Sequence, residues 1–125
     1  MRVLLVEDHA DTRELFTTFL AAHGHEVRTA VTGLQAIDLA LESPPDVVVL
    51  DLQMPGLDGW AAARHLKGHP RTARVPIVAL SARAFPEDEA RAREVGCDAF
   101  VAKPCVPTLV LEAITRAHEE RKLGG

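Results

Sequence analysis

The chain has 125 residues, of which 47% are hydrophobic and 26% are charged. This length predicts a single domain, and this composition excludes an intrinsically disordered chain. Eighteen acidic residues outnumber 14 basic ones and no basic run occurs, which argues against non-specific nucleic-acid binding. No apolar stretch approaches the roughly 18 residues of a membrane span, and the early acidic residues Glu7 and Asp8 argue against a signal peptide. We therefore expect a cytoplasmic protein.

Five short apolar runs predict β-strands, and segments with helical spacing lie between and after them. In chain order, the strands are expected at residues 3–6, 27–30, 47–50, 77–80 and 99–102. The helices that follow them are expected to begin at Asp11, Thr32, Asp58, Pro86 and Pro107. They are expected to end at Gly24, Pro44, Gly68, Gly96 and about Arg121. In the first helix, Leu15, Phe16, Phe19 and Leu20 are expected to form one buried stripe.

This alternation predicts one α/β domain, in which a five-stranded parallel sheet carries helices on both faces. The runs at residues 3–6, 47–50 and 77–80 are almost continuously apolar, which is typical of strands buried on both sides. In such sheets the functional site lies beyond the carboxyl ends of the strands, near the switch point of strand order. The polar residues that follow the strands are therefore the candidate site.

Polar side chains follow four of the five expected strands. Glu7 and Asp8 follow the first, Asp51 the third, Ser81 the fourth and Lys103 the fifth. Each residue taken alone is more typical of a solvated turn or a helix cap. Together, three carboxylates at one edge would repel one another unless a cation lay among them, and oxygen ligands favour Mg²⁺. A side chain as long as that of Lys103 could reach this point from a strand roughly 9–10 Å away.

In this order, these residues resemble the receiver domain of bacterial response regulators. The similarity extends from residue 1 to about residue 122 and is carried by Glu7-Asp8, the D-x-x-M-P-x-x-D-G stretch at residues 51–59, Ser81-Ala82 and Lys103-Pro104. It implies a flavodoxin-like, doubly wound sheet with strand order 2-1-3-4-5, a receiver domain at residues 1–122 and a short tail at residues 123–125. It further implies that Asp51 accepts a phosphoryl group from a histidine kinase or a histidine phosphotransfer protein.

The resemblance also implies a metal-dependent reaction. Mg²⁺, or Mn²⁺ in its place, would be held by Asp8, Asp51 and the backbone carbonyl of Gln53. Glu7 would act on the ion directly or through water. The ion would neutralise the carboxylate and phosphoryl oxygens so that two anions can approach each other.

The remaining family positions concern the response to phosphorylation. By resemblance, Ser81 and Lys103 would contact the phosphoryl group, and Phe100 would be the switch aromatic that turns inward. The family's bond before Pro104 is cis and would aim Lys103 into the site. Arg83 either shields the phosphoryl group or is solvated. We expect a downstream protein to bind the face made by the fourth helix, fifth strand and fifth helix, with no direct DNA binding and no membrane contact.

Two other function classes use similar residues. A phosphatase of the haloacid dehalogenase type needs a second aspartate two residues after the first, where Gln53 stands. A flavodoxin-like cofactor binder would hold phosphate after the first strand, where Glu7 and Asp8 would repel it. The sequence therefore favours a phosphorylated switch with slow autodephosphorylation over an enzyme. The Met start and the end just past the fifth helix favour a stand-alone receiver over a module excised from a larger regulator or hybrid kinase.

Ordinary structural roles are expected for several other residues. Cys97 and Cys105 are expected to be reduced, because roughly 17 Å of strand separates them and a disulfide tolerates about 7 Å. His9 is expected to be solvated, and Trp60 to pack against the sheet. The charged groups at Arg13-Glu14 and at residues 119–122 are expected to form solvated faces.

Overall fold

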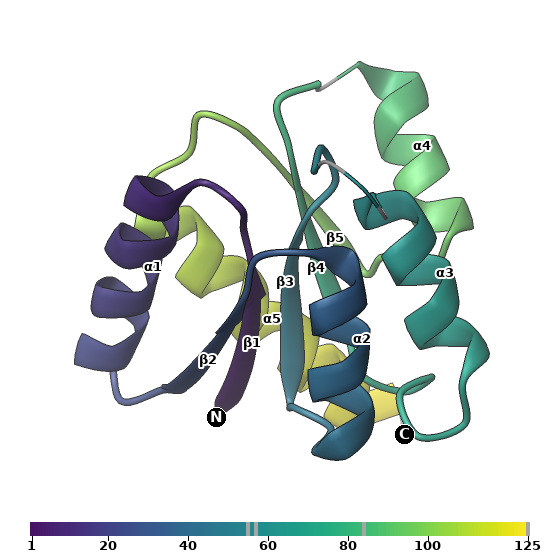
Figure 1. Cartoon of the computed structure of the whole chain (residues 1–125), viewed down its shortest axis with the longest axis horizontal. Coiled ribbons are helices and arrows are strands. Elements are labelled where there is room, and N and C mark those ends of the chain that lie inside the picture. Colours follow the sequence, from purple (N-terminus) through teal and green to yellow (C-terminus); the bar gives the residue numbers. More distant parts are fainter. Residues whose placement is uncertain (55, 57, 84, 125) are drawn as a thin grey trace.

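The computed structural model describes residues 1–54, 56, 58–83 and 85–124. Pro55 and Leu57 of the stretch at 51–59, and Gly125 of the expected tail, lie outside these residues. Within them, five strands and five helices alternate along the chain (Figure 1). The strands are β1 (Arg2–Val6), β2 (Glu26–Ala30), β3 (Val47–Asp51), β4 (Ile77–Ser81) and β5 (Ala99–Ala102). The helices are α1 (Ala10–Ala22), α2 (Gly33–Glu42), α3 (Gly59–Gly68), α4 (Pro86–Glu94) and α5 (Pro107–Gly124).

The five strands form one parallel sheet in the order β2-β1-β3-β4-β5, which confirms the expected flavodoxin-like topology. The register aligns the carboxyl ends of neighbouring strands. Val6 at the end of β1 lies opposite Leu50 of β3, and Ser81 at the end of β4 lies opposite Ala102 of β5. The residues that follow these strands therefore meet at one edge of the sheet.

Helices cover both faces of the sheet and enclose two apolar cores (Figure 1). Because side chains alternate along a strand, Leu4 and Val6 face one core while Val3 and Leu5 face the other. The helices α1 and α5 contribute Phe16, Leu20, Val110, Ile114 and Ala117 to one core. The helices α2, α3 and α4 contribute Ala36, Ala40, Trp60, Ala62, Ala63, Leu66 and Ala92 to the other.

Two of the helix starts are those expected from capping residues. The Thr32 hydroxyl accepts a hydrogen bond from the Gln35 amide at the start of α2, and the Asp58 carboxylate accepts one from the Ala61 amide at the start of α3. The last helix, α5, is longer than expected. It continues three residues beyond Arg121, so Leu123 and Gly124 of the expected tail belong to the helix.

Helix α1 differs from the expectation in two respects. It begins at Ala10, with His9 at the N-cap position and no side-chain cap, so Asp11 lies inside the first turn. There the carboxylate of Asp11 suits the positive end of the helix dipole. Leu15 is 54% exposed, so its expected place in the buried stripe is wrong. Phe16 and Leu20, four residues apart, are sufficient to cover the sheet, and Leu15 lies beside their line.

Charged side chains tie the amino-terminal edge of the sheet together. The Lys67 ammonium donates to the Val75 carbonyl at 2.7 Å and lies 3.2 Å from an Asp98 oxygen. The expectation that Arg121 is solvated is wrong, since its guanidinium donates to the other Asp98 oxygen at 2.8 Å. Burial lowers the pKa of Lys67 despite the neighbouring Asp98. The Lys67 side chain also packs closely against Gly96, where a Cβ would lie 2.5 Å from the Lys67 Cγ. With a φ of 100° as well, this position requires glycine.

Cys97, Cys105 and Trp60 lie as expected. Cys97 is buried, Cys105 is partly buried, and both are free thiols. Trp60 is buried in the core against α2–α4, and the Arg91 guanidinium lies 4.1 Å from the centre of its ring.

Within the part of the chain that is described, no helix combines the length and the apolar character that crossing a membrane requires.

Candidate functional site

Three carboxylates meet where β1 and β3 end. The pairing of Val6 with Leu50 brings the next residues, Glu7 and Asp51, to neighbouring strand ends, and Asp8 follows in the loop. One oxygen from each carboxylate lies within 4.8 Å of the others. Glu7 is 0% exposed and Asp51 is 3% exposed, whereas Asp8 is open to solvent. Two buried carboxylates this close require a cation nearby.

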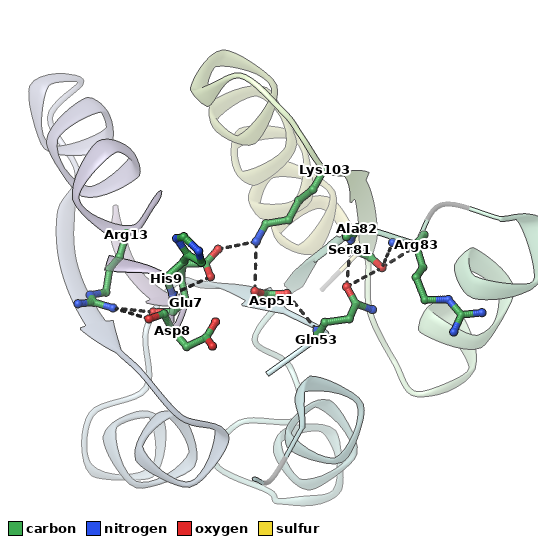
Figure 2. Close-up of polar contacts among 10 residues, drawn as sticks. All are labelled: Glu7, Asp8, His9, Arg13, Asp51, Gln53, Ser81, Ala82, Arg83 and Lys103. Atoms are coloured by element: carbon green, nitrogen blue, oxygen red, sulfur yellow. Dashed lines mark hydrogen bonds and ion pairs between the residues drawn. The ribbon is translucent and has the colours of Figure 1, made fainter. Parts of the chain in front are cut away.

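Lys103, directly after β5, supplies a positive charge to this group. Its ammonium donates to a Glu7 oxygen at 2.7 Å and to an Asp51 oxygen at 3.1 Å (Figure 2). Burial of the ammonium acts to lower its pKa, but the hydrogen bond to Glu7 and the charges of Asp51 and Glu7 outweigh burial, and the pKa of Lys103 is raised. The peptide bond between Lys103 and Pro104 is cis, as the resemblance implied.

On the other side of Asp51, Gln53 links the acidic group to the end of β4. The backbone amide of Gln53 donates to the Asp51 oxygen that Lys103 does not contact, at 3.0 Å. Its side-chain oxygen accepts from the Ser81 hydroxyl at 3.1 Å and from the Ala82 amide at 3.0 Å (Figure 2). The resemblance indicated the Gln53 backbone carbonyl as a metal ligand, but the sequence did not predict this side-chain contact. The place of Gln53, two residues after Asp51, was the signal in the sequence that its side chain could lie near the site.

The loop after β1 is held by a residue that sequence reasoning assigned to solvent. The Arg13 guanidinium donates to the Glu7 carbonyl at 3.0 Å and to the Asp8 carbonyl at 3.3 Å, so the expected solvated role of Arg13 is wrong. The His9 amide donates to a Glu7 side-chain oxygen at 3.2 Å, while His9 itself is exposed. Two carbonyls that end a strand need donors, and an arginine one turn into α1 can reach both.

Arg83 and Phe100 lie further from the acidic group. The Arg83 side chain is exposed and extends away from Asp51 (Figure 2). Its guanidinium forms an ion pair with Asp88 at 3.8 Å. Phe100 is partly buried against the core of α2–α4. It also lines a groove of about 600 Å³ between β5 and α5, together with Leu109 of α5. The aromatic residue therefore connects the core to the surface at which output is expected.

Helix α3 begins in direct contact with the strand that carries Asp51. A Cβ at Gly59 would lie 2.3 Å from the Asp51 carbonyl oxygen and 2.5 Å from the Leu52 Cα. Backbone atoms cannot yield to such a contact, so this position has room for glycine alone. The neighbouring Asp58 caps the helix at the same point. The position of the Asp51 main chain is thus fixed by close packing as well as by the sheet.

The donor set of the site suits a hard divalent cation. Glu7, Asp8 and Asp51 offer oxygen ligands only, as Mg²⁺ requires, and the fully buried Glu7 carboxylate has a cationic partner in Lys103. The Gln53 carbonyl stays a predicted ligand. Chemically, the arrangement presents one oriented carboxylate, Asp51, between the other two acids and the two hydrogen-bond donors at the end of β4 (Figure 2).

Comparison with known proteins identifies response regulators and their receiver domains as similar to this chain. A family model described as response regulator receiver domain matches residues 3–115. The polar-differentiation response regulator DivK of Brucella ovis is 35% identical over 112 residues, which cover 90% of this chain and 91% of DivK. The chemotaxis protein CheY4 of Vibrio cholerae has a TM-score of 0.88 and 28% identity, covering 93% of this chain and 97% of that chain.

A third relative bears on the metal. The receiver domain of the sensor histidine kinase PA1611 from Pseudomonas aeruginosa has a TM-score of 0.87 and 29% identity. The alignment covers 94% of this chain and 97% of that domain. That structure is described with a magnesium ion coordinated in its active-site cleft.

Proposed function

This chain belongs to the response regulator receiver family, and from that premise we propose that Asp51 is the phosphoacceptor of a Mg²⁺-dependent signalling switch. The observation that carries the proposal is the place of Asp51: a buried carboxylate at the end of the central strand, within reach of Glu7, Asp8 and Lys103. The donor would be a histidine kinase or a histidine phosphotransfer protein. The chain is proposed to be a substrate and switch rather than an enzyme acting on other molecules.

The residues present supply the positioning that phosphoryl transfer needs. An Asp51 oxygen forms a bond to phosphorus as the donor's phosphorus–nitrogen bond breaks. The Gln53 amide and the Lys103 ammonium hold the two Asp51 oxygens in a fixed orientation. Glu7, Asp8, Asp51 and the Gln53 carbonyl would hold Mg²⁺, which neutralises charge on the carboxylate and phosphoryl oxygens when bound. After transfer, Lys103 and the Ser81 hydroxyl would contact the phosphoryl oxygens.

The phosphorylated form would be recognised by a protein at the face of α4, β5 and α5. Support comes from Ser81, which ends β4 next to β5, and from Phe100, which lines the groove beside α5. Movement of Ser81 toward phosphate would favour the inward position of Phe100, as in a two-state switch. The free thiols and the acidic net charge of −4 fit a cytoplasmic partner protein better than DNA or a membrane surface.

Labelling with a small phosphodonor tests this proposal. Wild-type protein with Mg²⁺ should gain the mass of one phosphoryl group, and Asp51→Ala should gain none because the acceptor carboxylate is absent. Asp38→Ala, on the exposed face of α2, is the matched control and should be labelled as the wild type is. A chelator should prevent labelling. Labelling of Asp51→Ala at the wild-type level, or labelling unaffected by the chelator, would contradict the proposal.

A further inference from the structure

Two donors from consecutive residues converge on one oxygen of Gln53. The Ser81 hydroxyl and the Ala82 amide lie 3.1 and 3.0 Å from the Gln53 carboxamide oxygen. A backbone amide can only donate, so the carboxamide group must present its oxygen, and not its nitrogen, at this place. Paired donors that meet at one oxygen are also what a bound anion uses.

The Gln53 side chain reaches these donors from the acceptor residue's own loop. Its backbone amide is bonded to Asp51, so one chain of hydrogen bonds runs from Glu7 through Lys103, Asp51 and Gln53 to the end of β4 (Figure 2). The Ser81 hydroxyl is the donor that the proposed function assigns to the phosphoryl group. An oxygen of that group would need the hydroxyl that Gln53 already engages.

The contact can be broken without leaving a buried polar group unpaired. Gln53 and Ala82 are exposed, so the freed carboxamide and amide would be hydrated. Ser81 is fully buried, but its single hydroxyl proton has a second acceptor in the Arg83 carbonyl at 2.8 Å, and its oxygen accepts from the Arg83 amide at 3.0 Å. Ser81 therefore stays hydrogen-bonded when Gln53 leaves.

We propose that the Gln53 carboxamide is an internal competitor of the phosphoryl group. In the unphosphorylated protein it occupies the Ser81 and Ala82 donors, and it leaves them when an anion on Asp51 takes its place. This inference rests on the proposed role of Asp51. Because the hydrogen bonds to Gln53 exist in one state only, they favour the unphosphorylated form and weaken the hold on the phosphoryl group.

Binding of beryllofluoride, a phosphoryl mimic, in the presence of Mg²⁺ tests the competition. Gln53→Met keeps the length of the side chain and removes the acceptor oxygen, and Gln53→Ala removes both. Each should bind the mimic roughly threefold to tenfold more tightly than wild type, because the Ala82 hydrogen bond and the contact with the Ser81 proton, which the Arg83 carbonyl shares, no longer have to be given up. Every measurement is made at a Mg²⁺ concentration that calorimetry shows to be saturating for that variant, so a difference in metal affinity does not enter the comparison. In metal-free protein, the Ala82 amide proton should exchange faster in both variants.

Each other result has a distinct meaning. Unchanged or weaker binding of the mimic by Gln53→Met and Gln53→Ala overturns the competition, the weaker result because it assigns the carboxamide a stabilising contact with the anion. Failure of wild type and both variants to bind the mimic overturns the role of Asp51 and the competition with it. Tighter binding by Gln53→Ala alone would assign the effect to bulk and would also overturn the hydrogen-bond competition.

Discussion

At the scale of the residue, the site depends on how two buried acids are compensated. Glu7 and Asp51 lie at neighbouring strand ends, and both share the ammonium of Lys103. Removal of the partner of a buried carboxylate is strongly destabilising, because it leaves an uncompensated charge in the interior. In the protein without metal, Lys103 therefore has a structural role in addition to its proposed contact with the phosphoryl group.

Replacement of this lysine should expose that role. Lys103→Met is expected to lower the free energy of unfolding at neutral pH by up to about 3 kcal/mol, because Glu7 and Asp51 lose their shared cation. Mg²⁺ should recover more stability in this variant than in wild type, since the ion then meets no competing ammonium. Urea unfolding with and without Mg²⁺ measures both effects.

The matched control for this experiment lies on the same chain. Lys122→Met removes an exposed ammonium on α5 and should change the free energy of unfolding by less than about 0.5 kcal/mol. Equal stabilisation of wild type and Lys103→Met by Mg²⁺ would show that the lysine and the ion do not compensate the same carboxylates.

Sequence reasoning located the acids of the site but not the bonds that orient them. Glu7 and Asp51 follow apolar strands, and the parallel pattern requires their ends to meet. No pattern in a single sequence shows that Arg13 turns back to the carbonyls of the preceding loop, or that the Gln53 side chain lies across the site to Ser81. These contacts depend on side-chain rotamers, which are fixed only once neighbouring elements are packed.

At the scale of the element, α4 is the helix with the smallest share in the core. Its nine residues include two buried ones, Asp88 and Ala92. The helix is further held by Arg91, whose guanidinium lies over the ring of Trp60 on α3. A weakly anchored helix at the proposed output face is suited to shift between two positions at small energetic cost.

Removal of this contact should loosen α4 measurably. Arg91→Ala is expected to lower the free energy of unfolding by about 0.5–1 kcal/mol, the value of a cation–π contact near the surface. Trp60 is the single tryptophan of the chain, so its fluorescence reports on this contact directly. Its emission should move to longer wavelength as water replaces the guanidinium.

Arg93→Ala is the control on the same helix. It removes an exposed pair with Glu89, whose charged atoms lie 3.6 Å apart, and should leave the Trp60 emission unchanged. An equal emission shift in both variants would mean that general fraying of α4, and not the Arg91 contact, is being observed.

At this scale, the elements themselves followed closely from the sequence. Hydrophobic runs located the five strands, and Thr32 and Asp58 marked two helix starts, because caps and buried strands are local signals. The expected cap of α1 lies two residues too late, since Asp11 resembles a cap while the actual N-cap residue is His9, which makes no side-chain cap bond. The expected stripe of α1 is too wide, because Phe16 and Leu20 face the sheet, Phe19 packs partly against it, and Leu15 lies furthest around the helix from that line.

At the scale of the whole molecule, one sheet separates two cores, and the site lies at the edge that both cores share. Ser81 ends β4 next to β5, and Phe100 on β5 borders both a core and the groove beside α5. A change at Asp51 can therefore reach a distant face through two neighbouring strands, without any movement of the sheet as a body.

Removal of the Ser81 hydroxyl should separate phosphate binding from this transmission. Ser81→Ala is expected to bind beryllofluoride through Asp51 and Lys103, and to lose more than half of the amide shift changes at residues 82–121. Nuclear magnetic resonance spectra with Mg²⁺ and the mimic measure both. Wild-type changes confined to the surroundings of Asp51, or a full response of Ser81→Ala, would contradict this route.

The close approach of Gly59 to the Asp51 carbonyl has a genetic consequence. Any side chain at position 59 would displace either the start of α3 or the main chain of the acceptor residue. In a population of randomly mutated copies selected for lost signalling, this position should recur beside position 51, although glycine carries no reactive group. Such variants would keep every charged residue of the site and yet fail to signal. A comparison limited to the reactive side chains would therefore classify them wrongly as functional.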